Sequence, residues 1–311
     1  MDEIDITITM MLMANSRMPY AEIADMLQLS VNSVHKRVKS MVEIEALKNF
    51  QTKLSFLFFP NMANIIMFGE SSIKNSKHIM DKLGKNECIY NVTQASGNNF
   101  FIHAYIENIS QLDILIPFVR KNGGIKELLV GIDKAPPLNE IITTNDMTLS
   151  KVDYLIIHSL KDNSRKTIAE ISKEIGSSTK TIRRHLNRLI EKNLVRFTLD
   201  WYPDKTPQII SMLILKLKPN IDLDDLSFKQ KLQEKYGQKL VFTWAFSNLP
   251  NLFILCLRTK TTKELQGIQE SLSLMEFESM DIHILIEGKM FPTWLDTYLD
   301  NKVKEFTKNP K

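Results

Sequence analysis

Basic side chains gather in two short stretches of the chain, and their chemistry is that of phosphate binding. Residues 178–196 contain six Lys or Arg and one Glu, a net charge of +5. Residues 31–48 contain four basic and two acidic residues, a net charge of +2. The whole chain carries a net charge of only +4, so its remainder is net acidic. Because clustered Lys and Arg neutralise DNA phosphates and release their counterions, both stretches are candidate contacts to nucleic acid.

Each basic stretch is predicted to be a helix that buries one apolar stripe and shows its basic side chains to solvent. Apolar residues recur at helical spacing in both, and Ser30 and Ser178 precede the helices as N-caps. On such a helix most Lys and Arg contact phosphates, while residues near the N-terminal turn reach base edges. The predicted DNA-binding residues are Asn32, Ser33, His35, Lys36, Arg37 and Lys39 in the first helix, and Thr179, Lys180, Thr181, Arg183, Arg184 and Arg188 in the second.

The two helices belong to a duplicated segment. Asn15-Ser16-Arg17 recurs 148 residues later as Asn163-Ser164-Arg165. Between residues 5 and 47, 11 of 43 positions are identical to their counterparts without a gap. Each copy predicts three short helices with a tight turn before the third, which is the pattern of a helix-turn-helix DNA reader.

Several residues of this segment are predicted to be structural. Gly176 suits the left-handed conformation of the inter-helix turn, whereas Gln28 at the same place predicts a less regular turn. Asp5 and Asp153 are acids in a first helical turn, where they favour the helix dipole. Arg17 and Arg165 are expected to pair with an acid or to touch phosphate only at the edge of a complex.

After each helical segment and a short extended connection, the chain spells β-α-β-β-α-β, the order of a ferredoxin-like sandwich. The predicted fold is therefore α+β, with two winged or helix-turn-helix three-helix domains alternating with two ferredoxin-like α/β sandwiches. A polar linker with two prolines is predicted at residues 134–150, and the C-terminal helix is expected to dock on a sheet or on a second subunit. The predicted domains are residues 1–52, 57–133, 148–202 and 207–290, with a helical tail at 291–311.

The sequence contains few of the motifs that are typical of enzymes or membrane proteins. Two widely separated cysteines and six histidines without ligand spacing predict no metal site. No phosphate-binding loop, dinucleotide motif or nucleophile elbow is present, so no catalytic residue, no cofactor and no enzymatic activity are predicted. An acidic N-terminus and the interrupted apolar stretch at 56–68 predict no membrane association and a cytoplasmic location.

With this order of elements, the chain resembles the Lrp/AsnC family of prokaryotic, especially archaeal, transcription regulators. The matching stretches are Ile4-Asp5, Asn15-Ser16-Arg17, Ala21-Glu22-Ile23-Ala24, Leu27-Gln28-Leu29-Ser30 and Val34-His35-Lys36-Arg37-Val38, with Val152-Asp153, Asn163-Ser164-Arg165, Ala169-Glu170-Ile171 and Thr181-Ile182-Arg183-Arg184-His185-Leu186 in the second copy. The resemblance implies sequence-specific binding of double-stranded DNA by two readers on one chain. It also implies a homodimer or higher homo-oligomer, unless the fused chain works as a pseudo-dimeric monomer.

The resemblance further implies a small-molecule effector site at the turn between the middle strands, at Gly97, Asn98 and Asn99. In the family an acidic residue typically follows the glycine of this turn, and here it is absent, which speaks against an amino-acid effector. An alternative function comes from siroheme decarboxylases, which are similar tandem proteins that hold an anionic tetrapyrrole with His and Arg. The middle strands of this chain offer only His103 and Arg258 for that role.

Overall fold

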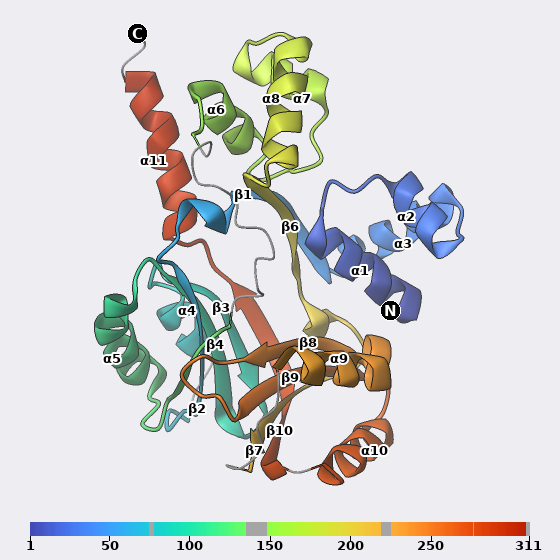
Figure 1. The fold of residues 1–311 in the computed structure, drawn as a ribbon, viewed down its shortest axis with the longest axis vertical. Helices are drawn as coiled ribbons and strands as arrows, with labels where there is room; N and C mark the ends of the chain where they lie inside the picture. The colour runs from blue at the N-terminus through green and yellow to red at the C-terminus, as the bar shows by residue number, and fades with distance from the viewer. Residues whose placement is uncertain (75–77, 135–147, 219–224, 276, 309–311) are drawn as a thin grey trace. The chain divides into compact units, whose positions relative to one another are not determined.

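The computed structural model of the 311-residue chain describes residues 1–74, 78–134, 148–218, 225–275 and 277–308. It confirms the α+β fold and divides into two compact units, each of which combines corresponding parts of both repeats (Figure 1). Most of the predicted linker, at 135–147, lies outside the described residues. The helical unit comprises Asp2–Pro60, Asn139–Tyr202 and Pro292–Lys311, and the sheet unit comprises Met1, Asn61–Leu138 and Pro203–Phe291.

The helical unit contains two three-helix bundles with the predicted caps. Ser30 and Ser178 each accept a hydrogen bond from the backbone N–H three residues on, which begins the third helix of each bundle. Thr167 and Glu170 form a capping box at the start of the second helix in the second bundle. The helices are α1 (Glu3–Ala14), α2 (Tyr20–Leu27) and α3 (Val31–Glu43), then α6 (Lys151–Ser159), α7 (Ile168–Ile175) and α8 (Thr179–Glu191).

The turn before the third helix has the same backbone conformation in both bundles. Gly176 has φ 72° and ψ 29°, and Gln28 has φ 55° and ψ 43°. The expectation of a less regular first turn is therefore wrong. Gln28 keeps the left-handed conformation because its N–H still reaches the carbonyl oxygens of Ala24 and Asp25 at the end of α2.

Because only glycine adopts this conformation without steric strain, we expect opposite effects from a matched pair of substitutions. Gln28→Gly should raise the free energy of unfolding by about 0.5–1 kcal/mol, since relief of strain exceeds the added chain entropy. Gly176→Ala should lower it by about 1 kcal/mol, although no heavy atom lies within 4 Å of the added methyl group. Urea unfolding followed by circular dichroism measures both. Changes of the same sign would contradict this explanation.

The extended connections that follow the bundles pair with each other. Strands β1 (Leu47–Leu54) and β6 (Val195–Trp201) form an antiparallel two-stranded ribbon. Helix α1 of the first bundle contacts β6, and helix α6 of the second bundle contacts β1. Helix α11 (Trp294–Lys308) packs on α6, where Asp300 binds Lys161 at 2.8 Å. The C-terminal helix thus docks on the second bundle and the ribbon of the helical unit.

The sheet unit contains two copies of the predicted β-α-β-β-α-β order. Its eight strands run β5-β2-β4-β3-β10-β7-β9-β8, so the two four-stranded halves join where β10 pairs antiparallel with β3. The first half consists of β2 (Ala63–Glu70), α4 (Ile79–Leu83), β3 (Ile89–Ala95), β4 (Asn99–Ile106), α5 (Leu112–Gly123) and β5 (Leu129–Ile132). The second consists of β7 (Ile209–Leu217), α9 (Asp225–Tyr236), β8 (Leu240–Ala245), β9 (Leu252–Thr259), α10 (Thr262–Ser273) and β10 (Phe277–Met290).

Strand β7 shows why part of this sheet is apolar on both of its faces. Its side chains alternate between two faces: Leu213 and Leu215 pack with Phe228 of α9, while Met212 and Ile214 pack with residues of the first half. Both faces are buried, one under helices and one against the other half. The unbroken apolar run of residues 212–215 follows from this double burial.

Candidate nucleic-acid interface

Helix α8 presents three cationic side chains to solvent. Ile182, Leu186 and Leu189 bury its inner stripe, whereas Lys180, Arg183 and Arg184 are exposed. Residues three and four apart lie on the same face of a helix, so these three cations form one surface near the N-terminal end of α8, which we call the basic triad. Thr179, also predicted to contact DNA, is exposed beside it.

The other residues predicted on α8 are engaged within the bundle. The Thr181 N–H donates to the Ser178 cap. Arg188 donates to the carbonyl oxygen of Thr148 at 2.6 Å and lies 3.5 Å from a carboxylate oxygen of Asp153. Arg188 therefore fixes α8 to the start of α6, and its guanidinium is less available to phosphate than those of the basic triad.

Helix α3 presents a less cationic surface. Asn32, His35, Lys36 and Lys39 are exposed, and Ser33 is half-buried with its N–H on the Ser30 cap. Lys39 lies 3.8 Å from Glu43. Among its predicted contacts, Lys36 is thus the cation that most resembles the basic triad in setting.

Arg37, also predicted to contact DNA, binds acids of its own bundle. It donates to Asp2 and to Asp5, each at 2.7 Å. The hydrogen bonds that Arg37 donates, first to Asp5 and then to Asp2, raise its pKa above the ordinary value. These acids offset its charge, so the difference between the two reading helices is larger than the net charges of their sequences indicate.

Asp5 and Asp153 do more than favour the helix dipole. Each closes a capping box at the start of its bundle and also binds the third helix, Asp5 through Arg37 and Asp153 through His185 at 2.8 Å. The Asp153 carboxylate is fully buried. Burial raises its pKa, but hydrogen bonds from Ser150 and His185 outweigh that effect and leave the pKa lowered.

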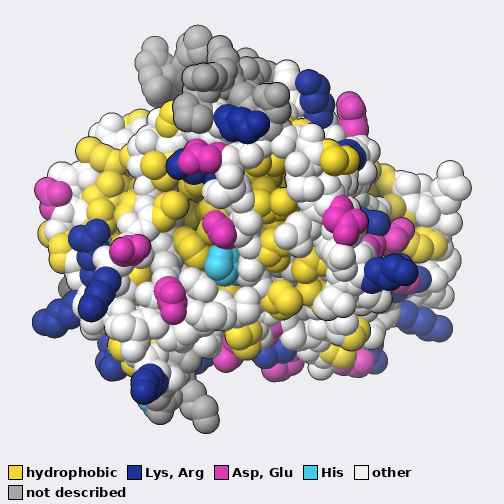
Figure 2. Space-filling view, turned by 90° about the horizontal axis from the view of Figure 1, so that it is seen from below, with side chains coloured by type: hydrophobic (Ala, Val, Ile, Leu, Met, Phe, Trp, Pro, Cys, Tyr) yellow, Lys and Arg dark blue, Asp and Glu magenta, His cyan; other side chains and the backbone are white. Residues whose placement is uncertain are grey.

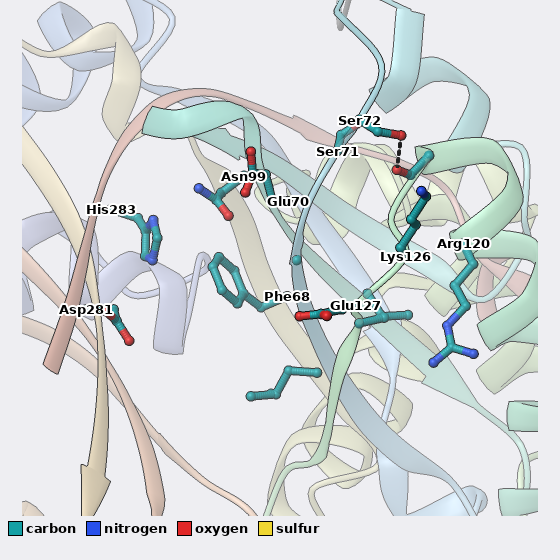
Figure 3. A pocket seen from close by; sticks show the side chains of 14 residues that line it. Phe68, Glu70, Ser71, Ser72, Asn99, Arg120, Lys126, Glu127, Asp281 and His283 are labelled. Atoms are coloured by element: carbon teal, nitrogen blue, oxygen red, sulfur yellow. Dashed lines mark hydrogen bonds between the residues drawn. The ribbon is translucent and has the colours of Figure 1, made fainter. Parts of the chain in front are cut away.

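The predicted effector residues lie at a cavity of the sheet unit. The cavity measures about 890 Å³ and is lined by Asn99, by the end of β2, by Arg120 and Lys126, and by Asp281 and His283 of β10 (Figure 3). Asn99 is one of its lining residues. Gly97 and Asn98 instead form the left-handed turn beside it, where the Asn98 amide donates to the carbonyl oxygens of Ser71 and Ile73.

The other polar residues of this cavity were not predicted from the sequence. His283 packs against Phe68 with ring centroids 4.8 Å apart, and burial lowers its pKa. Figure 3 shows Arg120 and Lys126 on one side of the cavity and His283 on the other. Only the pairing of β10 with its neighbours brings His283 here, and no spacing along the chain signals that.

The two residues considered for tetrapyrrole binding lie elsewhere. His103 is buried against Tyr90 and Trp244, and its burial lowers its pKa to about 4. Arg258 is 3% exposed and donates to Gln208 at 2.9 Å. Neither lines the cavity, whose own charged side chains are of both signs and include Glu70, Glu127 and Asp281.

One face of the molecule carries charges of both signs. Figure 2 shows a face on which hydrophobic side chains gather toward the centre, while the Lys and Arg side chains described there stand apart and alternate with Asp and Glu. Within the described residues, no three His, Cys, Asp or Glu side chains are grouped to hold a metal ion. No helix in the same part of the chain is both long and apolar enough to cross a membrane.

Comparison with known proteins adds evidence of two kinds. Residues 1–42 match the model of AsnC-type helix-turn-helix domains, and residues 149–196 match that of winged helix-turn-helix DNA-binding domains. The HTH-type transcriptional regulator Ptr1 of Methanocaldococcus jannaschii is 31% identical over 88 residues, which are 28% of this chain and 60% of that protein. An uncharacterized HTH-type transcriptional regulator of Pyrococcus abyssi is 30% identical over 96 residues, 30% of this chain and 65% of that protein. The chain thus spans less than two thirds of the length of either relative.

A solved structure shares the fold of almost the entire chain. The siroheme decarboxylase NirDL superposes with a TM-score of 0.56 over 98% of this chain and 100% of its own, at 10% sequence identity. At this level of sequence identity the likeness shows a shared fold, including its duplication, and does not show that the two proteins share a reaction.

Proposed function

Because this chain is a tandem Lrp/AsnC-like protein with helix-turn-helix domains at residues 1–42 and 149–196, we propose that it is a sequence-specific, double-stranded-DNA-binding transcription regulator. The observation that carries the proposal is the basic triad. Lys180, Arg183 and Arg184 are exposed together on the third helix of a reader domain, which is the helix that enters the major groove in such domains.

The two reading helices support recognition of two unlike half-sites. Exposed Lys180 and Arg183 of α8 correspond, at the repeat offset of 148, to exposed Asn32 and His35 of α3. Arg and Lys contact guanine and phosphate, whereas Asn favours adenine. We therefore expect an asymmetric operator whose half-site centres lie about 34–36 Å apart, or a multiple of that.

The test is binding of the purified chain to genomic DNA fragments, measured by gel shift and footprinting at 50 and 200 mM salt. We expect a footprint with two unequal halves and an affinity that falls about 10³-fold or more if six or more phosphates are contacted. No footprint, or an affinity independent of salt, would contradict the proposal.

The cavity beside Asn99 is the candidate site for an effector of that regulator. Its lining combines Arg120 and Lys126 with Glu70, Glu127 and Asp281, so it suits a small ligand that carries both charges or several hydrogen-bonding groups rather than a polyanion.

Size-exclusion chromatography with light scattering establishes whether DNA is bound by one pseudo-dimeric chain or by a homodimer with four readers.

Siroheme decarboxylation is the second candidate, because the likeness to NirDL extends over 98% of this chain. The burial of His103 and Arg258 away from the cavity, and the acids of its lining, oppose it. Titration with an iron uroporphyrin, followed by its Soret band, separates the two functions. Saturable one-to-one binding without DNA binding would favour the enzyme.

A further inference from the structure

The duplicated Asn-Ser-Arg segments lie against each other where the two bundles meet inside the helical unit. The hydroxyl oxygens of Ser16 and Ser164 are 2.6 Å apart, and both residues are fully buried. These two residues occupy equivalent positions in the two repeats. The contact is therefore one of like with like, as at a two-fold axis.

Two arginines extend this contact in both directions. Arg17 donates through Nη1 to the carbonyl oxygens of Ser164 and, at 2.9 Å, of Lys166. Arg165 donates to the carbonyl oxygens of the two residues flanking Arg17, at 2.6 and 3.2 Å. Each guanidinium thus binds the backbone of the opposite bundle. We call Ser16, Arg17, Ser164 and Arg165 the clamp.

The guanidinium groups are held by more than these hydrogen bonds. Arg165 lies over the ring of Tyr20 of the first bundle, 4.2 Å from its centroid, and Arg17 lies 5.7 Å from the centroid of Phe197. Burial, and then the like charge of Arg165, lower the pKa of Arg17. Two neighbouring cations are stable here because backbone carbonyl oxygens accept hydrogen bonds from them and aromatic rings cover them.

The ribbon alone gives weaker control over the orientation of the bundles. A two-stranded ribbon is only marginally stable by itself, and the register of β1 against β6 shifts between Lys48 and Gln51. The clamp segments rest on this ribbon, because the Ser16 N–H donates to Phe197 and the Ser164 N–H to Phe50. The clamp therefore adds a second attachment between the bundles. The ribbon and the clamp together restrict the relative orientation of the bundles more than the ribbon does alone.

We propose that the clamp sets the separation and relative orientation of α3 and α8, and so determines which half-site spacing the chain accepts. This inference rests on the proposed DNA-binding function. The four clamp residues are positioning residues: they contact the backbone of the opposite bundle, and the DNA contacts belong to the outer surfaces of α3 and α8. A rigid pair of readers concentrates the second reader at one spacing, whereas a flexible pair spreads it over several.

The experiment compares wild type with Arg17→Ala/Arg165→Ala on DNA duplexes whose two half-sites are moved apart one base pair at a time. Wild type should bind one spacing best. The variant should lose about 10-fold in affinity at that spacing, keep its affinity for a single half-site, and show a flat dependence on spacing. Lys166→Ala is the matched control, because it removes a nearby positive charge while the clamp uses only the carbonyl oxygen of Lys166. An unchanged spacing preference in the double variant would overturn the proposal.

A second measurement does not depend on DNA. Spin labels are attached to Lys39→Cys and Asn187→Cys, which are exposed and equivalent positions of α3 and α8. Pulsed electron paramagnetic resonance then reports the distance between the two reading helices. The native Cys88 and Cys256 are buried and should not take up the label. We expect a narrow distance distribution that broadens in the clamp variant and also in Ser16→Ala/Ser164→Ala, which keeps both arginines. An equally narrow distribution in these variants refutes the clamp. A broadened one in a protein that binds no DNA refutes only the proposed function.

Discussion

Replacing Lys180, Arg183 and Arg184 together with alanine is expected to weaken DNA binding by about 100-fold or more and to reduce the salt dependence of the affinity. Each lost phosphate contact lowers the slope of log affinity against log salt by about 0.9, and a lost base contact adds about 1–3 kcal/mol. These side chains are exposed and contribute nothing to the buried stripe of α8. The variant should therefore retain its circular dichroism spectrum and melting temperature. Fluorescence anisotropy at three or more salt concentrations measures the effect.

The matched control is Lys36→Ala/Lys39→Ala on α3. It removes two exposed cations from the equivalent helix, one of which already lies 3.8 Å from Glu43. We expect a loss of about 10-fold, smaller than that of the basic triad. If the substitutions on α3 weaken binding more than those on α8, the ranking of the two readers is wrong. If the triad variant binds as tightly as wild type, α8 is not a reader.

Asp153→Ala is expected to lower the free energy of unfolding of the second bundle by about 3 kcal/mol, which is a typical cost of removing one partner of a buried ion pair. The carboxylate has no solvent exposure and receives hydrogen bonds from Ser150 and His185. Its removal leaves His185 and Arg188 without their shared acid. Hydrogen exchange of the α6 and α8 amides measures the effect locally. Asp5→Ala in the first bundle is the comparison and should have a smaller effect, because Asp5 is 14% exposed.

The same carboxylate predicts a dependence on acid. The pKa of Asp153 in the folded protein is lowered, because hydrogen bonds from Ser150 and His185 outweigh burial. A carboxylate with a lowered pKa stabilises the fold above its unfolded value of about 3.9, and this stabilisation is lost as the pH falls through the folded pKa. Asp153→Asn should therefore flatten the loss of stability below about pH 4. A variant that loses stability as steeply as wild type in acid would show that other carboxylates dominate.

The sequence predicted the elements of this fold well, for a local reason. Helix caps at Ser30 and Ser178 and the spacing of apolar residues are decided within a few residues along the chain. The strands of the sheet unit could be recognised for the same reason. The duplication identified equivalent residues in the two halves, and that equivalence is what gives the symmetry of the clamp its meaning.

The candidate interface was only partly predictable. Net charge ranked α8 above α3, but the sequence could not show that Arg37 binds Asp2 and Asp5, or that Arg188 binds Thr148. Such pairing depends on which side chains meet when helices pack, and the same cation serves phosphate or a neighbouring acid. The residues of the predicted effector turn likewise have different roles in the structure. Asn99 lines the cavity, whereas the Asn98 amide donates to the backbone carbonyl oxygens of Ser71 and Ile73.

The order of residues alone indicates that this protein is two copies of one module, with two unlike basic helices and two α/β sandwiches. Repeats, caps and periodicity are properties of the order of residues, so they can be recognised without knowing the tertiary structure. How the two copies join follows only from three-dimensional packing: β1 pairs with β6, the two half-sheets meet where β3 pairs with β10, and the Asn-Ser-Arg segments contact each other. Burial of an edge strand or of a polar turn requires a partner from far along the chain, and that choice depends on three-dimensional complementarity.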